Sequence, residues 1–281
     1  QSPNHQTIIN NGGQMGAYNG WERANWFAKD GDDTSENSTQ TWNREGPWFS
    51  RVREECLAVN RNVGVLDLPG FSRFKVEGSG ASEFLLSKIS GNLPAIDRMN
   101  LAYFPDERGR VLTEMSIMRH DLNKFTLITA GAAQWHDYEI LKLGINKNQN
   151  VEVSDITNNW TCLIVTGPNS RSLINSISNA DLTLPWLSLQ NAKIENKQIL
   201  LARVSYAGEL GWEIHAKNED MSLIYEKVLS EGATPFGMFA LDSLRVEKGY
   251  RAWKGDLSTD YSLLESGLER FIKFDKKEVF P

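Results

Sequence analysis

The sequence contains little cysteine, no long apolar run and no excess of basic residues. Its two cysteines, Cys56 and Cys162, are far apart and lack the C-x-x-C spacing that metal and redox motifs use. We therefore expect no disulfide framework and no metal site, and we expect a reducing compartment, the cytoplasm. No apolar run reaches the roughly 20 residues that a membrane-spanning helix requires, so no membrane partner is expected.

Two further absences narrow the possible ligands. The 30 lysines and arginines are outnumbered by 36 aspartates and glutamates, for a formal net charge of −6, and the two signs are interspersed. Because nucleic-acid binders usually carry a basic patch or stripe, no nucleic-acid partner is expected. The glycines at residues 78–80 lack the third glycine of a G-x-G-x-x-G loop. We therefore expect no flavin or nicotinamide site within this chain.

The composition changes along the chain near residue 47. Residues 1–46 are rich in Asn, Gly, Gln, Asp and Ser, which predicts a polar N-terminal arm or linker. Residues 47–281 read as one globular domain, and a chain of 281 residues is long enough to bury a proper core. Four tryptophans lie in or beside the arm, and we expect them to pack on this same domain rather than on another protein: Trp21, Trp26, Trp42 and Trp48.

Hydrophobic periodicity predicts a mixture of helices and strands. Helices are predicted over residues 47–60, 81–89, 134–143, 221–230 and 237–248, with one more around residues 173–177. Strands are predicted over residues 71–76, 111–118, 125–129, 151–156, 163–165, 199–205 and 212–215. These elements do not alternate strictly as in a doubly wound sheet, so the order favours an α+β fold over an α/β one.

Residues 203–214 are a first candidate for chemistry. The predicted tight hairpin contains Gly208 and Gly211, which would let its backbone approach another surface closely. Tyr206 and Glu213 lie at the two ends of the turn, so both side chains can address one ligand. A plain hairpin with a solvated glutamate is the alternative.

Residues 245–253 are a second candidate, where a predicted helix leads into an aromatic and basic loop. Arg251 and Lys254 could meet anionic groups there, because the guanidinium fork matches a carboxylate. The alternative is an ordinary helix end, at which cations are favoured by the helix dipole.

Residues 109–117 are a third candidate. Along a strand, side chains alternate between faces, so Glu114 is expected to point away from Val111, Met115 and Ile117. A carboxyl group on a half-apolar strand face can have a raised pKa and take part in proton transfer. An exposed strand face would give the same pattern.

Together these segments resemble the glycine-cleavage T-protein, or aminomethyltransferase, family. The pattern R-x-x-Y-T-G-E-x-G-(aromatic)-E-(aliphatic) is matched at residues 203–214, with Ala207 in place of threonine. The pattern L-R-x-E-K-G-(aromatic)-R-x-W is matched at residues 244–253. Weaker matches occur at residues 21–28, 74–78, 166–171, 264–268 and 271–273. The similarity is greatest to the folate half of dimethylglycine and sarcosine dehydrogenases.

The resemblance implies an aminomethyltransferase-type folate-binding domain with tetrahydrofolate as its cofactor. By this resemblance Glu213 accepts hydrogen bonds from the pterin ring, Tyr206 lines the same pocket, and Arg251 meets the glutamate tail of the folate. Glu114 stands where the family has an aspartate, and it is expected to assist formation of methylene-tetrahydrofolate. Glutamate extends that arm by one methylene group, which affects its positioning.

The implied reaction is one-carbon transfer from a methylated amine such as dimethylglycine, sarcosine or glycine. A flavin domain or subunit is an expected partner, and the family's β-rich C-terminal domain is expected to be absent from this fragment. One alternative is a folate-dependent sulfonium demethylase. Another is a non-catalytic folate-binding accessory protein of the iron–sulfur branch, whose loop carries a cysteine that residues 248–253 lack. A degenerate structural domain that has lost folate is a further alternative.

Overall fold

The computed structural model describes residues 1–18, 20–35, 45–146 and 149–276. It divides the chain into two compact units, which are described in turn. Unit 1 comprises Gln1–Pro69, Asn158–Trp186 and Gln190–Tyr250. Unit 2 comprises Gly70–Thr157, Leu187–Leu189 and the chain from Arg251 onward. Within the described residues, no helix is long and apolar enough to cross a membrane.

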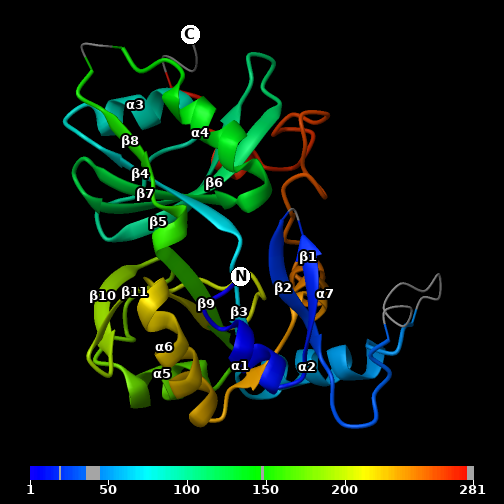
Figure 1. The fold of residues 1–281 in the computed structure, drawn as a ribbon. Coiled ribbons are helices and arrows are strands. Elements are labelled where there is room, and N and C mark those ends of the chain that lie inside the picture. Colours follow the sequence, from blue (N-terminus) through cyan, green and yellow to red (C-terminus); the bar gives the residue numbers. More distant parts are fainter. Residues whose placement is uncertain (19, 36–44, 147–148, 277–281) are drawn as a thin grey trace. The chain divides into compact units, whose positions relative to one another are not determined.

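Unit 1 is built on a six-stranded sheet with the order β10-β11-β12-β9-β3-β13 (Figure 1). Its strands are β3 (Gly64–Asp67), β9 (Trp160–Thr166), β10 (Leu189–Ile194), β11 (Lys197–Ala202), β12 (Gly211–Lys217) and β13 (Thr234–Pro235). β12 pairs antiparallel with β11 and β9, and β3 pairs antiparallel with β9. Only β13 runs parallel to its neighbour among the pairs described.

Two helices cover one face of this sheet. They are α5 (Ser170–Ile177) and α6 (Asn218–Ser230), which lie along the sheet in Figure 1. Leu173, Ile174 and Ile177 recur at helical spacing, so α5 presents one apolar face to the sheet. These residues join a core that also contains Trp212 and Ile214 of β12. Burial of this apolar surface is what holds the two layers of unit 1 together.

The predicted polar arm contributes structure to unit 1. It contains helix α1 (His5–Asn10) and the antiparallel hairpin β1 (Gly13–Tyr18) to β2 (Trp21–Phe27). Trp26 is fully buried, which confirms that it packs on this same chain. Trp42 lies outside the described residues. The division between the units therefore does not fall at residue 47.

A buried carboxylate ties this hairpin to two helices, α2 (Phe49–Arg61) and α7 (Met238–Glu247). Glu55 of α2 accepts hydrogen bonds from the backbone N–H of Phe27 at 2.7 Å and of Gly237 at 2.9 Å. Because the side chain is only 4% exposed, burial raises its pKa to about 7. The hairpin end and the start of α7 are thereby joined at one side chain.

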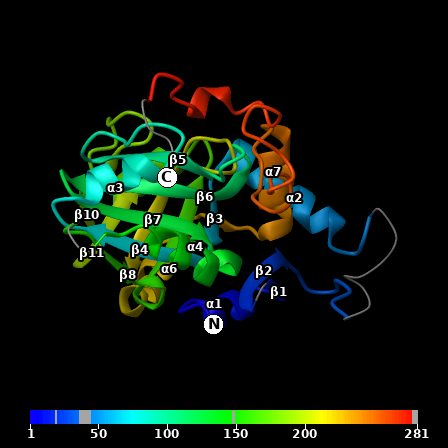
Figure 2. The ribbon, with the colours of Figure 1, turned by 90° about the horizontal axis from the view of Figure 1, so that it is seen from above.

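Unit 2 contains a five-stranded antiparallel sheet with the order β5-β6-β7-β4-β8. Its strands are β4 (Phe71–Glu77), β5 (Arg98–Pro105), β6 (Val111–Asp121), β7 (Lys124–Ala130) and β8 (Glu152–Asp155). Helices α3 (Ala81–Lys88) and α4 (Gln134–Lys142) cover one face, as Figures 1 and 2 show. The chain after Arg251, including the short helix η4 (Glu269–Phe271), packs beside Tyr103 and Val111.

The mixed helices and largely antiparallel sheets confirm the predicted α+β class. The predicted helices are all present, with ends displaced by a few residues. The strands β1, β2, β3, β5, β10 and β13 and the helix α1 were not predicted.

Candidate functional site

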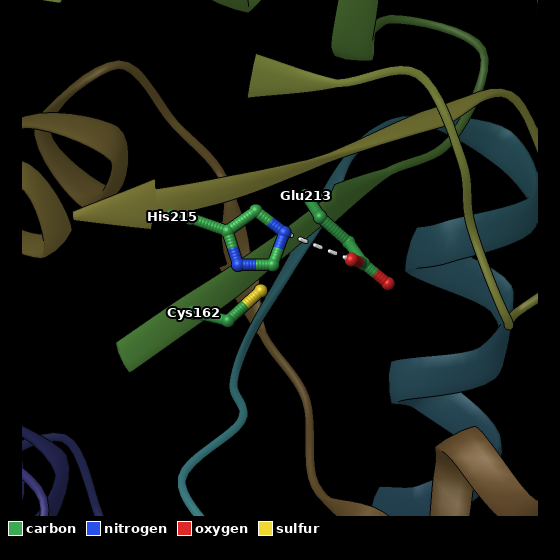
Figure 3. Close-up of side chains that lie close together, drawn as sticks. All are labelled: Cys162, Glu213 and His215. Atoms are coloured by element: carbon green, nitrogen blue, oxygen red, sulfur yellow. Dashed lines mark hydrogen bonds and ion pairs between the residues drawn. The ribbon is translucent and has the colours of Figure 1, made fainter. Parts of the chain in front are cut away.

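Glu213 and His215 share one face of β12. Trp212 and Ile214 of this strand are buried in the core of unit 1. Because side chains alternate along a strand, Glu213 and His215 point to the other face. The imidazole Nε2 of His215 lies 3.0 Å from the carboxylate Oε2 of Glu213 (Figure 3). The side chain of His215 is 4% exposed and that of Glu213 is 18% exposed. The contact with His215 therefore holds the Glu213 carboxylate in place, while part of the side chain remains exposed to solvent.

Cys162 of β9 is the direct cross-strand partner of His215. Its thiol lies beside the imidazole, as Figure 3 shows, and it is buried. One ligand atom from each of Cys162, Glu213 and His215 lies within 4.8 Å of the other two. This group was not predicted, because Cys162 and His215 lie 53 positions apart in the sequence.

The connection before β12 is a loop rather than the predicted tight hairpin. The last registered pair of β11 and β12 is Ala202 with Glu213, so residues 203–210 form an eight-residue loop (210 − 203 + 1). Gly208 has a φ of +77°, and a Cβ there would lie 2.2 Å from Cγ of Lys248. Only glycine combines this backbone angle with so close an approach. The first strand was therefore predicted to run three residues too far toward the turn, whereas the second begins one residue earlier than predicted.

Tyr206 lies in this loop and stacks on Tyr250, with 6.0 Å between ring centroids and 20° between the ring planes. Tyr250 owes its position to the end of α7. Gly249 has a φ of +70° and donates to the carbonyl of Val246, while the N–H of Tyr250 donates to the carbonyl of Arg245. This pair of bonds is a Schellman motif. The motif ends α7 at this glycine.

In unit 2, Glu114 of β6 lies directly opposite Tyr103 of β5. A side-chain hydrogen bond joins the phenol to the carboxyl group. Burial raises the pKa of Glu114 to about 7, and the hydrogen bond from Tyr103 opposes part of that shift. A carboxyl group with this pKa can both give and accept a proton near neutral pH.

A β-bulge sets which side chains accompany Glu114. Between Thr113 and Val111 the register with β5 shifts, because Leu112 is an extra residue in β6. A shift of one residue turns the following side chain to the opposite face. Val111 therefore packs in the cluster of Tyr103, whereas Met115 packs beneath the helices. The prediction that Val111 and Met115 share a face is wrong for this reason.

Arg251 belongs to unit 2 and its side chain is exposed. The guanidinium groups of Arg251 and Arg270 act on the Tyr103 phenol and lower its pKa, although burial and the Glu114 carboxyl raise it by more. Positive charge therefore lies near the Tyr103 and Glu114 pair. By the family resemblance, Arg251 was predicted to meet the glutamate tail of the folate.

A second carboxyl group of unit 2 was missed by the sequence analysis. Asp137 of α4 is fully buried, and burial raises its pKa. The Thr129 hydroxyl hydrogen bonds to this carboxyl and also lies 3.3 Å from the backbone carbonyl of Glu114. His136 Nδ1 lies 2.8 Å from the other carboxyl oxygen. Asp137 therefore braces β6 and β7 close to Glu114.

The four predicted site residues are divided between the units. Tyr206 and Glu213 lie in unit 1, and Glu114 and Arg251 lie in unit 2. Sequence reasoning missed the side chains that these residues contact: Tyr103, Tyr250 and His215. Of these, His215 alone carried a sequence signal, because it lies two residues from Glu213 and so shares its strand face.

Comparisons with known proteins identify the family of this chain. The family model described as the GCVT N-terminal domain matches residues 4–276. Dimethylglycine dehydrogenase of Mus musculus, a mitochondrial protein, is 33% identical over 95% of this chain. This chain spans 31% of that relative's length. Aminomethyltransferase of Staphylococcus epidermidis is 31% identical over 78% of the chain and 61% of its own length.

Solved structures show the same fold. The glycine cleavage system aminomethyltransferase T of Bartonella henselae has a TM-score of 0.80 at 21% identity, covering 97% of this chain and 69% of that one. A chain of the heterotetrameric sarcosine oxidase from Corynebacterium has a TM-score of 0.50 at 16% identity, covering 72% of this chain and 96% of that one. With nearly its whole length matched, this chain belongs to the family of the GCVT N-terminal domain, the aminomethyltransferase T-protein family.

Proposed function

We propose that this chain binds tetrahydrofolate and passes to it a one-carbon unit from a methylated amine such as dimethylglycine, sarcosine or glycine. The observation that carries the proposal is the Glu213 carboxylate, which His215 fixes and which remains 18% exposed. Glu213 lies in the segment, residues 203–214, that matches the family pattern. We propose residues 47–281 as the folate-binding domain. Helix α1 and the β1–β2 hairpin, which precede residue 47, belong to unit 1.

The donor and acceptor groups fit a reduced pterin. The pterin ring presents a 2-amino group and a ring N–H as adjacent donors, and one carboxylate can accept both. A carboxylate offers about four lone-pair sites, so Glu213 can serve the pterin while His215 occupies part of Oε2. Tyr206, held against Tyr250, provides an aromatic wall from the same unit. We assign pterin recognition to Glu213 and Tyr206.

The residues of unit 2 fit the other tasks of the transfer. Glu114 would hold or move the proton of the nitrogen that receives the carbon, because its pKa is about 7. Arg251 is an exposed cation and suits the carboxylates of the folate tail. We propose Glu114 as the catalytic residue and Arg251 as the tail-binding residue.

Oxidation of the amine needs an electron acceptor, and we propose a flavin domain or subunit as the partner that supplies it. This chain spans about a third of the dimethylglycine dehydrogenase of mouse and of the 4-methylaminobutanoate oxidase of Paenarthrobacter nicotinovorans. The latter is 30% identical over the whole of this chain. We propose the cytoplasm as the compartment, because neither Cys56 nor Cys162 forms a disulfide.

The oxidation state of the product tests the proposal. The chain is mixed with tetrahydrofolate, dimethylglycine and a flavoprotein that oxidises dimethylglycine. The folate products are then separated. Methylene-tetrahydrofolate formed faster than without the chain is the expected result. Methyl-tetrahydrofolate formed from a sulfonium compound without any oxidant would favour the demethylase. Folate binding without any accelerated transfer would favour the accessory protein.

A further inference from the structure

We propose that Cys162, Glu213 and His215 form a binding site for one divalent metal ion of the zinc class. Among the described residues, the three side chains bring a sulfur, an oxygen and a nitrogen ligand atom within 4.8 Å of one another. The inference goes beyond folate binding, because it concerns an ion and a buried thiol to which the proposed transfer gives no role. Only its functional consequence, stated below, depends on the proposed function.

The backbone fixes the three positions. His215 and Cys162 are cross-strand partners in the antiparallel β12 and β9 pair, so their Cβ atoms lie about 5 Å apart on one face of the sheet. Glu213 is two residues from His215 on β12 and points to the same face. The ligand atoms thus come from two adjacent central strands of a six-stranded sheet rather than from mobile loops.

The ligand types suit zinc. Thiolate, imidazole and carboxylate are its ordinary protein ligands, with bonds of about 2.0–2.3 Å. Tetrahedral geometry with these bonds places the ligand atoms about 3.3–3.6 Å apart. His215 Nε2 and Glu213 Oε2 are 3.0 Å apart, and all three ligand atoms lie within 4.8 Å of one another, so binding an ion would draw the thiol inward and move the other two atoms slightly apart. The fourth position stays open for water, as in zinc sites with three protein ligands.

Charge and access also favour an ion here. As whole residues Cys162 and His215 are each 3% exposed, whereas the Glu213 side chain is 18% exposed, so the carboxylate is the ligand group that solvent reaches most readily. On binding, the thiol proton passes to solvent, and the thiolate and carboxylate together balance the two positive charges of the ion. The imidazole contributes a neutral nitrogen. A buried cysteine that would otherwise be a small apolar filler thereby becomes a ligand.

The consequence is competition between the ion and the folate. Glu213 is the side chain that we propose as the pterin acceptor, and it cannot serve both a metal ion and the two pterin donors at full strength. We therefore infer that zinc and tetrahydrofolate exclude one another at this site. This step rests on the proposed function.

Cobalt(II) provides the test of the site, because a cobalt thiolate absorbs in the near ultraviolet and tetrahedral cobalt absorbs in the visible. We expect the wild-type chain to bind one cobalt ion with both absorptions, and zinc to abolish them. Cys162→Ser should lose the thiolate band, and Glu213→Gln should weaken cobalt binding at least tenfold. Cys56→Ser is the matched control and should behave as the wild type. Circular dichroism checks that each variant is folded.

Absence of a thiolate band in the wild type would overturn the site, as would its loss in Cys56→Ser with retention in Cys162→Ser. Competition is read separately, by titrating tetrahydrofolate anaerobically with and without saturating zinc. We expect zinc to weaken folate binding at least tenfold in the wild type and not in Cys162→Ser. Cobalt binding without this competition would support the metal site and show that Glu213 does not bind the pterin. Folate binding without cobalt binding would support the proposed function and overturn the metal site.

Discussion

Tyr103 and Glu114 face each other directly across β5 and β6, and the hydrogen bond between them holds a carboxyl group whose pKa burial raises to about 7. The pair is fixed by strand register, since the bulge at Leu112 lies to one side of it. A rigid strand position is well suited to place a proton-transfer group against a substrate.

Removing the carboxyl group should slow transfer without weakening folate binding. Glu114→Ala is expected to reduce the rate of methylene-tetrahydrofolate formation by about 10²–10⁴, the usual effect of losing a general acid–base group. Tetrahydrofolate affinity should stay within about twofold, because Glu213 holds the pterin. Glu114→Asp should retain much of the rate. Normal turnover by Glu114→Ala would reduce Glu114 to a structural strand residue.

Removing the phenol hydroxyl should change the pH dependence of the same step. The hydrogen bond from Tyr103 lowers the pKa of Glu114, so Tyr103→Phe should raise that pKa above its present value of about 7. The pH–rate profile is expected to shift to higher pH, while Tyr261→Phe, which changes a phenol that is 52% exposed, should leave it in place. An unshifted profile in Tyr103→Phe would show that the hydrogen bond does not tune the carboxyl group.

Stability should fall as the pH rises from about 5 to 8. Burial raises the pKa of Glu114 and Glu55 to about 7 from the ordinary 4.5, so the folded chain binds more protons than the unfolded chain in this range. The corresponding stabilisation is complete below the unfolded pKa and disappears as the pH passes the folded pKa. Carboxyl groups with a lowered pKa, such as Asp32 and Glu54, act only at lower pH.

Urea unfolding of the wild type and of Glu114→Gln checks this sign. The rise in the pKa of Glu114 from 4.5 to about 7 corresponds to at most roughly 3 kcal/mol of stability. We expect Glu114→Gln to lose less stability than the wild type between pH 5 and pH 8. Equal losses in both proteins would mean that Glu114 is solvated in the folded chain.

Much of the fold followed from local pattern in the sequence. Cys56 and Val59, spaced by three residues, predicted α2, and alternation around Phe125 predicted β7. Strand β10 was missed because its buried apolar residues, Leu189, Ala192 and Ile194, do not alternate strictly, and β1 because two of its six residues are glycine. The fully buried Trp26 shows that a polar composition does not exclude a packed strand. Local pattern reports only the segments whose own side chains are apolar.

The candidate site was less accessible to sequence reasoning because it depends on register. Strand pairing decides that His215 faces Cys162 and that Tyr103 faces Glu114, and neither pairing is encoded near either residue. A single extra residue, Leu112, turned Val111 to the unexpected face. Such one-residue effects cannot be read from hydrophobic alternation.

The loop at residues 203–210 should tolerate no side chain at Gly208. Gly208→Ala would place a methyl group 2.2 Å from Cγ of Lys248 at a positive φ, so we expect a loss of about 1–3 kcal/mol and weaker folate binding. Gly232→Ala is the matched control, because its φ is +90° but nothing lies within 4 Å of the added Cβ. Thermal unfolding and folate titration compare the two. Equal effects would show that backbone strain alone, and not the approach of Lys248, constrains the loop.

The most direct test of the central claim is the affinity of Glu213→Gln for tetrahydrofolate. The amide keeps the shape of the side chain but replaces one acceptor oxygen with a donor, which leaves a charge-assisted contact half satisfied. Isothermal titration should show a dissociation constant raised by about tenfold to a hundredfold, corresponding to about 1.5–3 kcal/mol. Glu219→Gln, which removes the same charge from a side chain that is 74% exposed in the same unit, should bind as the wild type does. Equal dissociation constants for Glu213→Gln and the wild type would contradict the account, because the carboxylate would then not hold the pterin.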